Sequence, residues 1–93
     1  MSPHRAIVKN TNLPPDMQDQ AVKACLKAMT TCRHDKDVAA AIRNTFNQKY
    51  GRTWHCIVGG SFGSNVSHID TGLIYFFMGQ KSILLFRSEK SNV

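Results

Sequence analysis

The sequence lacks the long apolar segments that membrane-spanning or exported proteins require. No apolar run approaches the roughly 20 residues needed to cross a bilayer, and residues 1–5 are not followed by a signal-type apolar block. We therefore expect a chain that is neither exported nor membrane-spanning. Its 93 residues predict one domain, from 1 to 93, with flexible ends at 1–4 and 89–93. A chain this short buries only about two-thirds of its unfolded surface, which favours oligomerisation.

Cysteine is scarce, and its pattern excludes a disulfide framework. The three cysteines, Cys25, Cys32 and Cys56, are an odd number at irregular spacing, which is typical of reduced thiols in the cytosol. Cys25 and Cys32 are seven residues apart and share a helix face, but a metal would need two further ligands. His34 follows Cys32 too closely for a zinc-finger spacing. We interpret the thiols as core residues and expect no metal and no cofactor.

The residues needed for catalysis are also few. Only six carboxylates are present, and three of them, Asp16, Asp19 and Asp35, lie at or near predicted helix starts, where capping explains them. His55 and Cys56 are neighbours in a predicted strand, so they point to opposite faces and cannot pair as base and nucleophile. His68 has no acidic partner nearby in sequence to orient it. The glycines at 59, 60 and 63 lack the helix and lysine of a phosphate loop. The sequence favours a protein that is not an enzyme.

Positive charge is plentiful but is not concentrated. The net charge is +6 and the isoelectric point about 9.6, which permits binding to phosphate groups. The twelve basic residues are scattered, with no basic run and no alternation of basic and aromatic residues of the RNA-binding kind. We therefore interpret them as solvated surface residues. A basic nucleic-acid-binding module stays as the alternative, to be recognised by a steep dependence of binding on salt.

Two helices are predicted in the first half of the chain. Pro14 and Pro15 suit a first helical turn, and apolar residues then recur at spacings of three and four. This stripe consists of Met17, Ala21, Ala24, Cys25, Ala28, Met29 and Cys32. Asp35 or a neighbour is expected to cap a second helix that ends at Gly51. Its apolar side is formed by Val38, Ala41, Ile42, Thr45, Phe46 and Tyr50.

The remaining segments predict an antiparallel sheet. Strands are expected at residues 5–10, 54–58, 61–68, 73–78 and 82–86. Gly59-Gly60 is expected to form a tight turn with positive φ, and Gly79-Gln80 a two-residue hairpin loop. This hairpin sets a register in which Met78 faces Lys81, Phe76 faces Ile83 and Ile74 faces Leu85. On the other face, Tyr75 then lies opposite Leu84 and Leu73 opposite Phe86.

The predicted fold class is α+β, with two helices packed on an antiparallel sheet. Both faces of the sheet are apolar, and the two helices cover only one of them. We expect a second copy of the chain to cover the other face. The strand at residues 61–68 combines one large anchor, Phe62, with small and polar residues that leave its backbone accessible. Such a strand is suited to pairing with an added strand.

An ordered set of short motifs resembles the LC8 class of cytoplasmic dynein light chains. The match runs almost without gaps from about residue 5 to residue 88. The motifs are VKN at 8–10, KD at 36–37, QKY at 48–50, TWHCIVG at 53–59, FGS at 62–64, IYF at 74–76, GQ at 79–80 and ILLF at 83–86. Each motif alone is weak, but together they cover nearly the whole chain.

The resemblance implies a homodimer in which the strand around residues 62–66 crosses to the partner subunit. Two sheets then pack face to face, and a short disordered segment, often with a Thr-Gln-Thr core, adds as an antiparallel strand beside each exchanged strand. The implied activity is that of a non-enzymatic dimeric hub and light chain of the dynein motor. The implied partners are disordered segments of client proteins, with the dynein intermediate chain as one candidate. The implied location is the cytoplasm, in association with the cytoskeleton.

The resemblance also assigns roles to individual residues. The implied peptide-binding residues are Lys9, Asp35, Lys36, Ser61, Phe62, Gly63, Ser64, Asn65, Val66, Ser67, His68, Tyr75, Phe77 and Leu84. The implied dimer-interface residues are His55, Phe62, Ser64 and Ser88. Asp35 and Lys36 would receive the ligand glutamine at the helix start. A phosphate on Ser88 would oppose association through its negative charge.

The chain departs from the LC8 pattern at several of these positions. Asp35 replaces the usual glutamate and is one methylene shorter. Asn65 and Phe77 stand where tyrosine is usual, and Ser67 stands where threonine is usual. Gly60-Ser61 replaces an arginine and an asparagine. These departures predict a paralogue whose motif preference is its own.

Overall fold

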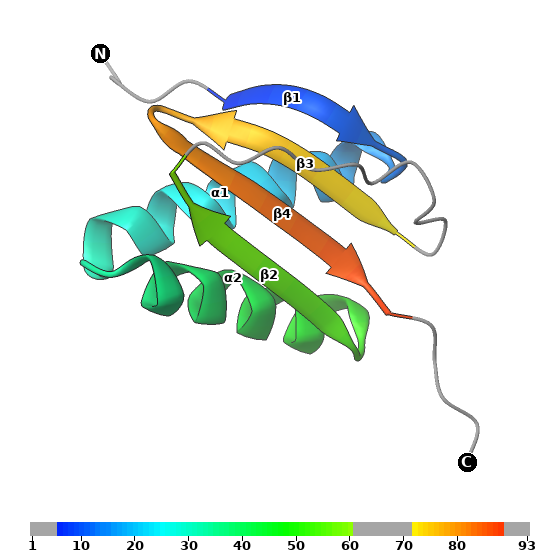
Figure 1. Cartoon of the computed structure of the whole chain (residues 1–93). Helices are drawn as coiled ribbons and strands as arrows, with labels where there is room; N and C mark the ends of the chain where they lie inside the picture. The colour runs from blue at the N-terminus through cyan, green and yellow to red at the C-terminus, as the bar shows by residue number, and fades with distance from the viewer. Residues whose placement is uncertain (1–5, 61–71, 89–93) are drawn as a thin grey trace.

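The computed structural model describes residues 6–60 and 72–88. It contains two helices and four strands (Figure 1). In chain order they are β1 (Ala6–Thr11), α1 (Pro15–Thr31), α2 (Asp35–Tyr50), β2 (Trp54–Gly59), β3 (Leu73–Met78) and β4 (Lys81–Arg87). The predicted strand at residues 61–68 and the ends predicted to be flexible, 1–4 and 89–93, lie outside the described residues.

The four strands form one antiparallel sheet in the order β1-β3-β4-β2. The predicted hairpin register is confirmed, since Met78 pairs with Lys81 and Tyr75 with Leu84. Gly79 begins the connecting turn with a φ of 61°, a conformation that costs glycine little because it has no Cβ. This hairpin places β3 and β4 at the centre of the sheet.

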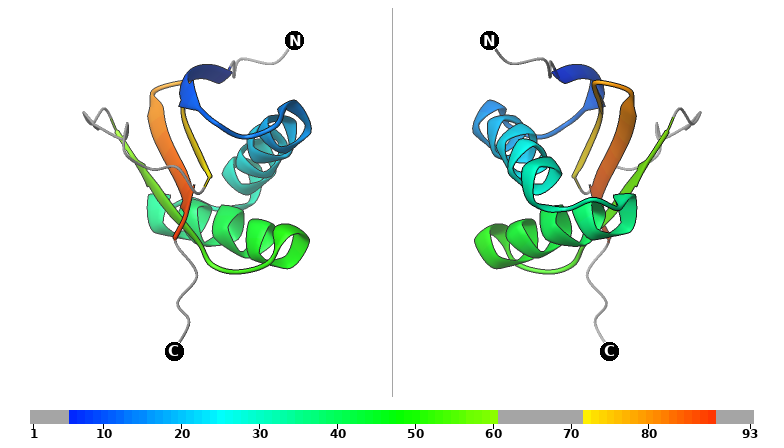
Figure 2. Two further views of the ribbon diagram at one scale, coloured as in Figure 1. Left: turned by 90° about the vertical axis from the view of Figure 1, so that its right-hand side faces the viewer. Right: turned by 90° about the vertical axis from the view of Figure 1, so that its left-hand side faces the viewer.

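Both helices lie on the same face of the sheet (Figure 2). The predicted apolar stripes are confirmed, because Ala21, Cys25 and Ala28 of α1 and Val38, Ile42 and Phe46 of α2 are buried. Phe46 lies at the centre of this core. Its ring is 4.9 Å from that of Trp54 and 5.0 Å from that of Tyr50. No described helix is long and apolar enough to cross a membrane.

The opposite face of the sheet, which we call the free face, carries a second apolar cluster. Leu73, Tyr75 and Leu84 form it, with Phe77 and Phe86 packed beside them. Neither helix lies on this face (Figure 2). The three central side chains are nevertheless only 2–7% exposed within the single chain. The expectation that a second copy of the chain covers this face stays a prediction.

The prediction of a positive-φ turn at Gly59-Gly60 is wrong. Among the described residues only Gly51, Gly72 and Gly79 have positive φ. Gly59 instead pairs with Ser82, because the ladder between β2 and β4 continues through it and keeps its backbone extended. The prediction for Gly51 is correct, since it ends α2 with a φ of 82°.

Candidate functional site

The outer edge of β2 is one of the two edges of the described sheet, β1 forming the other, and is suited to strand addition. β2 pairs with β4 on one side, and no described strand pairs with its other side. An unpaired strand edge presents backbone N–H and C=O groups to any added strand. Ile57, at the middle of β2, is 50% exposed. Apolar surface and backbone groups are thus available along one edge.

Most of the residues that the resemblance assigns to peptide binding lie in the segment of the chain that follows β2. Residues 61–71 are outside the described part of the chain. The assigned residues in that stretch are Ser61, Phe62, Gly63, Ser64, Asn65, Val66, Ser67 and His68. Their roles in peptide binding and dimerisation stay predictions.

Four other predicted site residues lie together on the free face. Tyr75 of β3 and Leu84 of β4 are directly paired. The rings of Tyr75 and Phe77 meet edge to face at 5.6 Å. The ammonium group of Lys9 lies 5.6 Å from the centre of the Phe77 ring, within the distance of a cation–π contact. Sequence positions 9, 75, 77 and 84 therefore form one continuous surface.

Asp35 and Lys36 begin α2, away from this cluster. The prediction that Asp35 or a neighbour caps this helix with its side chain is wrong. His34 is the N-cap residue, and no side chain there accepts a hydrogen bond from the first turn. The Asp35 carboxylate instead pairs with Lys81, whose Nζ is 3.0 Å from Oδ1 and 3.1 Å from Oδ2. Lys36 is exposed beside it.

Sequence reasoning missed Lys81 as a partner of Asp35. The signal was present, because the hairpin register placed Lys81 opposite Met78 on the face that the helices cover. A lysine on the covered face at the start of a strand needs an acidic partner or access to water. Asp35, at the start of the nearest helix, supplies the acidic partner. The contact is half-exposed, with 40% and 38% of the two side chains open to water.

His55 and Ser88 lie near the free face and the start of β2. His55 is exposed in the single chain, and its ring is 5.2 Å from that of Phe86. The backbone N–H of Ser88 donates to the carbonyl of Thr53 at 3.0 Å, and its hydroxyl donates to the same carbonyl at 3.4 Å. Their roles in a dimer interface stay predictions.

The three cysteines are free thiols, in agreement with the sequence analysis. Burial raises the pKa of Cys25 to about 12. Burial also raises the pKa of Cys56 to about 12, and the nearby Cys25 acts in the same direction. Both thiols therefore stay protonated at neutral pH and are poor nucleophiles. Within residues 6–60 and 72–88, no group of three or more His, Cys, Asp or Glu side chains is placed to hold a metal.

We predict that Cys25 makes the protein less stable in alkali. The unfolded thiol loses its proton near pH 9.0, whereas the folded thiol keeps it until about pH 12. The stability that this protonated thiol contributes is complete below pH 9.0 and is lost as the pH rises towards 12. Between about pH 8 and about pH 10.5 the loss amounts to about 2 kcal/mol.

Urea unfolding of wild type and Cys25→Ala across this pH range measures that loss. The variant is less stable at neutral pH but loses less stability in alkali, so the two curves converge. Cys32→Ala is the matched control, because Cys32 is only half-buried. Parallel curves for wild type and Cys25→Ala would contradict the prediction.

Comparison with known proteins gives a family match that covers most of the chain. The sequence profile of the family described as "Dynein light chain type 1" matches residues 5–88. This match covers all of the described helices and strands. The chain is a member of the dynein light chain type 1 family. The resemblance to LC8-type light chains is thereby confirmed, and so is the predicted fold of two helices on an antiparallel sheet.

Two solved structures place this dynein light chain among its relatives. The dynein light chain-like domain of the Fasciola hepatica calcium binding protein FhCaBP2 is 25% identical, with a TM-score of 0.81 and coverage of 94% of each chain. The DLC-like domain of CsTAL3 has a TM-score of 0.78 at 12% identity, with 91% of this chain and 94% of that one covered. At that identity the second likeness shows the fold alone. Dynein light chains are non-enzymatic adaptors, and their domains commonly dimerise and bind partner proteins.

Proposed function

We propose that this dynein light chain is a dimeric hub that binds short disordered segments of client proteins by β-strand addition. The observation that carries the proposal is the outer edge of β2, along which no described strand pairs, beside the apolar free face. In the proposed dimer, residues 62–66 of each copy pair along the partner's sheet. The client segment, with a Thr-Gln-Thr-like core, then adds beside that exchanged strand.

In this arrangement backbone hydrogen bonds provide affinity and side-chain contacts provide specificity. Each backbone bond contributes about 1 kcal/mol net, so a few of them give modest affinity. Specificity comes from alternate side chains of the added strand, which point into neighbouring pockets. Lys9, Tyr75, Phe77 and Leu84 are the described residues that we assign to these pockets, with Asp35 and Lys36 receiving the ligand glutamine.

Two equivalent sites in one dimer allow modest affinity at each site to give strong binding of a paired client. A client with one motif per chain is held in pairs, because binding of the first chain raises the effective concentration of the second. We propose that this stapling of clients into dimers is the cellular role. Incorporation into the cytoplasmic dynein motor, through its intermediate chain, is the specific instance that the family name suggests. It implies a cytoplasmic, cytoskeleton-associated protein.

Calorimetric titration with a Thr-Gln-Thr peptide tests the binding step, and sedimentation equilibrium across a wide concentration range tests the dimer. We expect one peptide per chain and a mass of two chains at neutral pH. A persistent monomer would remove bivalent stapling. A dimer that shows no heat of binding with the peptide would remove strand addition in this form.

The contact between Asp35 and Lys81 predicts a substitution that raises the affinity for the peptide. Lys81→Met removes the cation that occupies the Asp35 carboxylate, so the carboxylate becomes available to the ligand glutamine. We expect the affinity for a Thr-Gln-Thr peptide to rise severalfold, while the free energy of unfolding falls by no more than about 1 kcal/mol, as for an exposed ion pair. Calorimetry and urea unfolding measure the two effects.

Arg52→Gln is the control, since it removes one positive charge at an exposed residue outside this contact. Asp35→Ala should lower the affinity for the peptide, both in wild type and in the Lys81→Met background. If Lys81→Met and Arg52→Gln change the affinity equally, Asp35 does not receive the ligand glutamine.

A further inference from the structure

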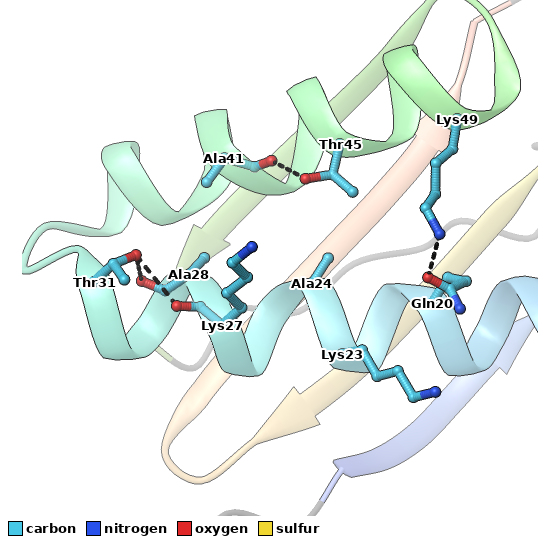
Figure 3. A pocket seen from close by; sticks show the side chains of 9 residues that line it. All are labelled: Gln20, Lys23, Ala24, Lys27, Ala28, Thr31, Ala41, Thr45 and Lys49. Carbon is cyan, nitrogen blue, oxygen red and sulfur yellow. Dashed lines mark hydrogen bonds between the residues drawn. The ribbon is translucent and has the colours of Figure 1, made fainter.

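A groove lies between α1 and α2 on the side of the helices that faces away from the sheet (Figure 3). It has a volume of about 310 Å³. We call it the interhelical groove, and its lining residues are Gln20, Lys23, Ala24, Lys27, Ala28, Thr31, Ala41, Thr45 and Lys49. Its volume is at the lower end of the range of ligand pockets, about 300–1,000 Å³.

The floor of the interhelical groove is made of small apolar side chains. Ala24 and Ala28 come from α1 and Ala41 from α2. The hydroxyl groups at the groove are used by their own helices, since Thr45 donates to the carbonyl of Ala41 at 2.9 Å and Thr31 to that of Lys27 at 3.2 Å. The floor therefore offers apolar contact and few hydrogen-bonding groups.

The rim of the interhelical groove is basic. Figure 3 shows Lys49 reaching from α2 toward α1, where its Nζ donates to Oε1 of Gln20 at 2.8 Å. Lys27 extends from α1 toward α2, and Lys23 lies along α1. Among residues 6–60 and 72–88 the one ion pair is Lys81 with Asp35, so no described carboxylate neutralises these three ammonium groups. None of the described lining residues is acidic.

We propose that the interhelical groove binds an acidic segment of a partner protein. Carboxylates of the segment contact Lys23, Lys27 and Lys49, and a short aliphatic side chain between them rests on the alanine floor. Complementary charge across such a surface speeds encounter and selects acidic partners. The Lys49 ammonium group exchanges its contact with the neutral Gln20 amide for a carboxylate, which forms the stronger, charge-assisted hydrogen bond.

The lining favours a protein segment over a nucleic acid. No aromatic or arginine side chain is present among the described lining residues, whereas single-stranded nucleic acids are held by stacking on such groups. An apolar floor also adds nothing to the binding of a phosphate backbone. It does stabilise a bound segment that alternates carboxylates with an aliphatic residue.

The interhelical groove is independent of the proposed client site. It opens on the helix side of the molecule, and the free face lies on the other side of the sheet (Figure 2). Dimerisation through the free face would leave both copies of the groove accessible. One client segment at the sheet edge and one acidic segment at the helices could then be held together.

Fluorescence anisotropy with a labelled twelve-residue peptide, Glu-Asp-Leu-Glu repeated three times, tests the proposal at low salt. The test variant is Lys27→Glu with Lys49→Glu. The matched control is Arg43→Glu with Arg52→Glu, which changes the net charge equally at exposed residues outside the groove. We expect at least a tenfold loss of affinity in the test variant and less than a twofold change in the control. A peptide with serine in place of leucine should bind severalfold more weakly.

Four results would overturn the proposal, and displacement by DNA is the fourth. Absence of binding to wild type is the first, and equal loss in both double variants, which would indicate a general charge effect, is the second. The third is a serine peptide that binds as well as the leucine peptide. A twelve-nucleotide DNA that displaces the acidic peptide from wild type at lower concentration would make nucleic acid the occupant. Binding of the Thr-Gln-Thr peptide is measured on the same variants and is expected to be unchanged, so the two proposals fail separately.

Discussion

His55→Lys will convert the proposed dimer into monomers at neutral pH. His55 is exposed in the single chain, next to Phe86 on the free face, and a second copy on that face would enclose it. An enclosed and unpaired charge costs about 2–5 kcal/mol, so at about 1.4 kcal/mol per tenfold the dissociation constant of the dimer rises roughly thirtyfold to several thousandfold. Sedimentation equilibrium measures that change.

His55→Gln is the matched control, because it replaces the imidazole without adding a charge. It should stay dimeric at neutral pH. Because the side chain is exposed in the single chain, His55→Lys should fold normally. A dimeric His55→Lys variant would place His55 outside the interface.

Phe46→Ala will bring the protein close to unfolding. Phe46 is fully buried, and its ring lies about 5 Å from those of Tyr50 and Trp54, so it joins α2 to the first residue of β2. Truncation of a buried phenylalanine to alanine typically costs about 3–5 kcal/mol, because apolar contact is lost and a cavity remains. Small domains have a total stability of only about 5–15 kcal/mol.

Urea unfolding at one fixed protein concentration measures this cost and keeps any contribution from dimerisation constant. Asn44→Ala is the control on the same helix, since Asn44 is exposed and surface substitutions change stability by about 0.5 kcal/mol or less. A loss below about 1 kcal/mol for Phe46→Ala would mean that the core rearranges to fill the space, and that this aromatic contact does not fix α2 on the sheet.

Much of the fold follows from local patterns in the sequence. Pro14 and Pro15 mark the start of α1, and Gly51 marks the end of α2, because these residues fix or free the backbone whatever surrounds them. The register of β3 and β4 follows from the two-residue turn at Gly79, because the length of a hairpin loop determines which residues face each other. The family follows from the order of short motifs.

Other features depended on contacts between distant parts of the chain. Glycine is common in turns, but the pairing of Gly59 with Ser82 of β4 keeps the backbone of Gly59 extended. Asp35 is a residue type that often caps helices, but its carboxylate pairs with Lys81, which is 46 residues further along the chain. Local propensities of this kind are worth only about 1 kcal/mol, so a tertiary contact can override them.

The sequence by itself determined the elements, the central hairpin register, the apolar core face and the family to which the chain belongs. Only the tertiary structure decided how the charges are placed. The basic residues are scattered along the chain, but packing of α1 against α2 brings Lys23, Lys27 and Lys49 around one groove. The physical reason is that helical periodicity fixes which face a residue occupies, whereas the neighbour of that face is fixed only when the helices pack.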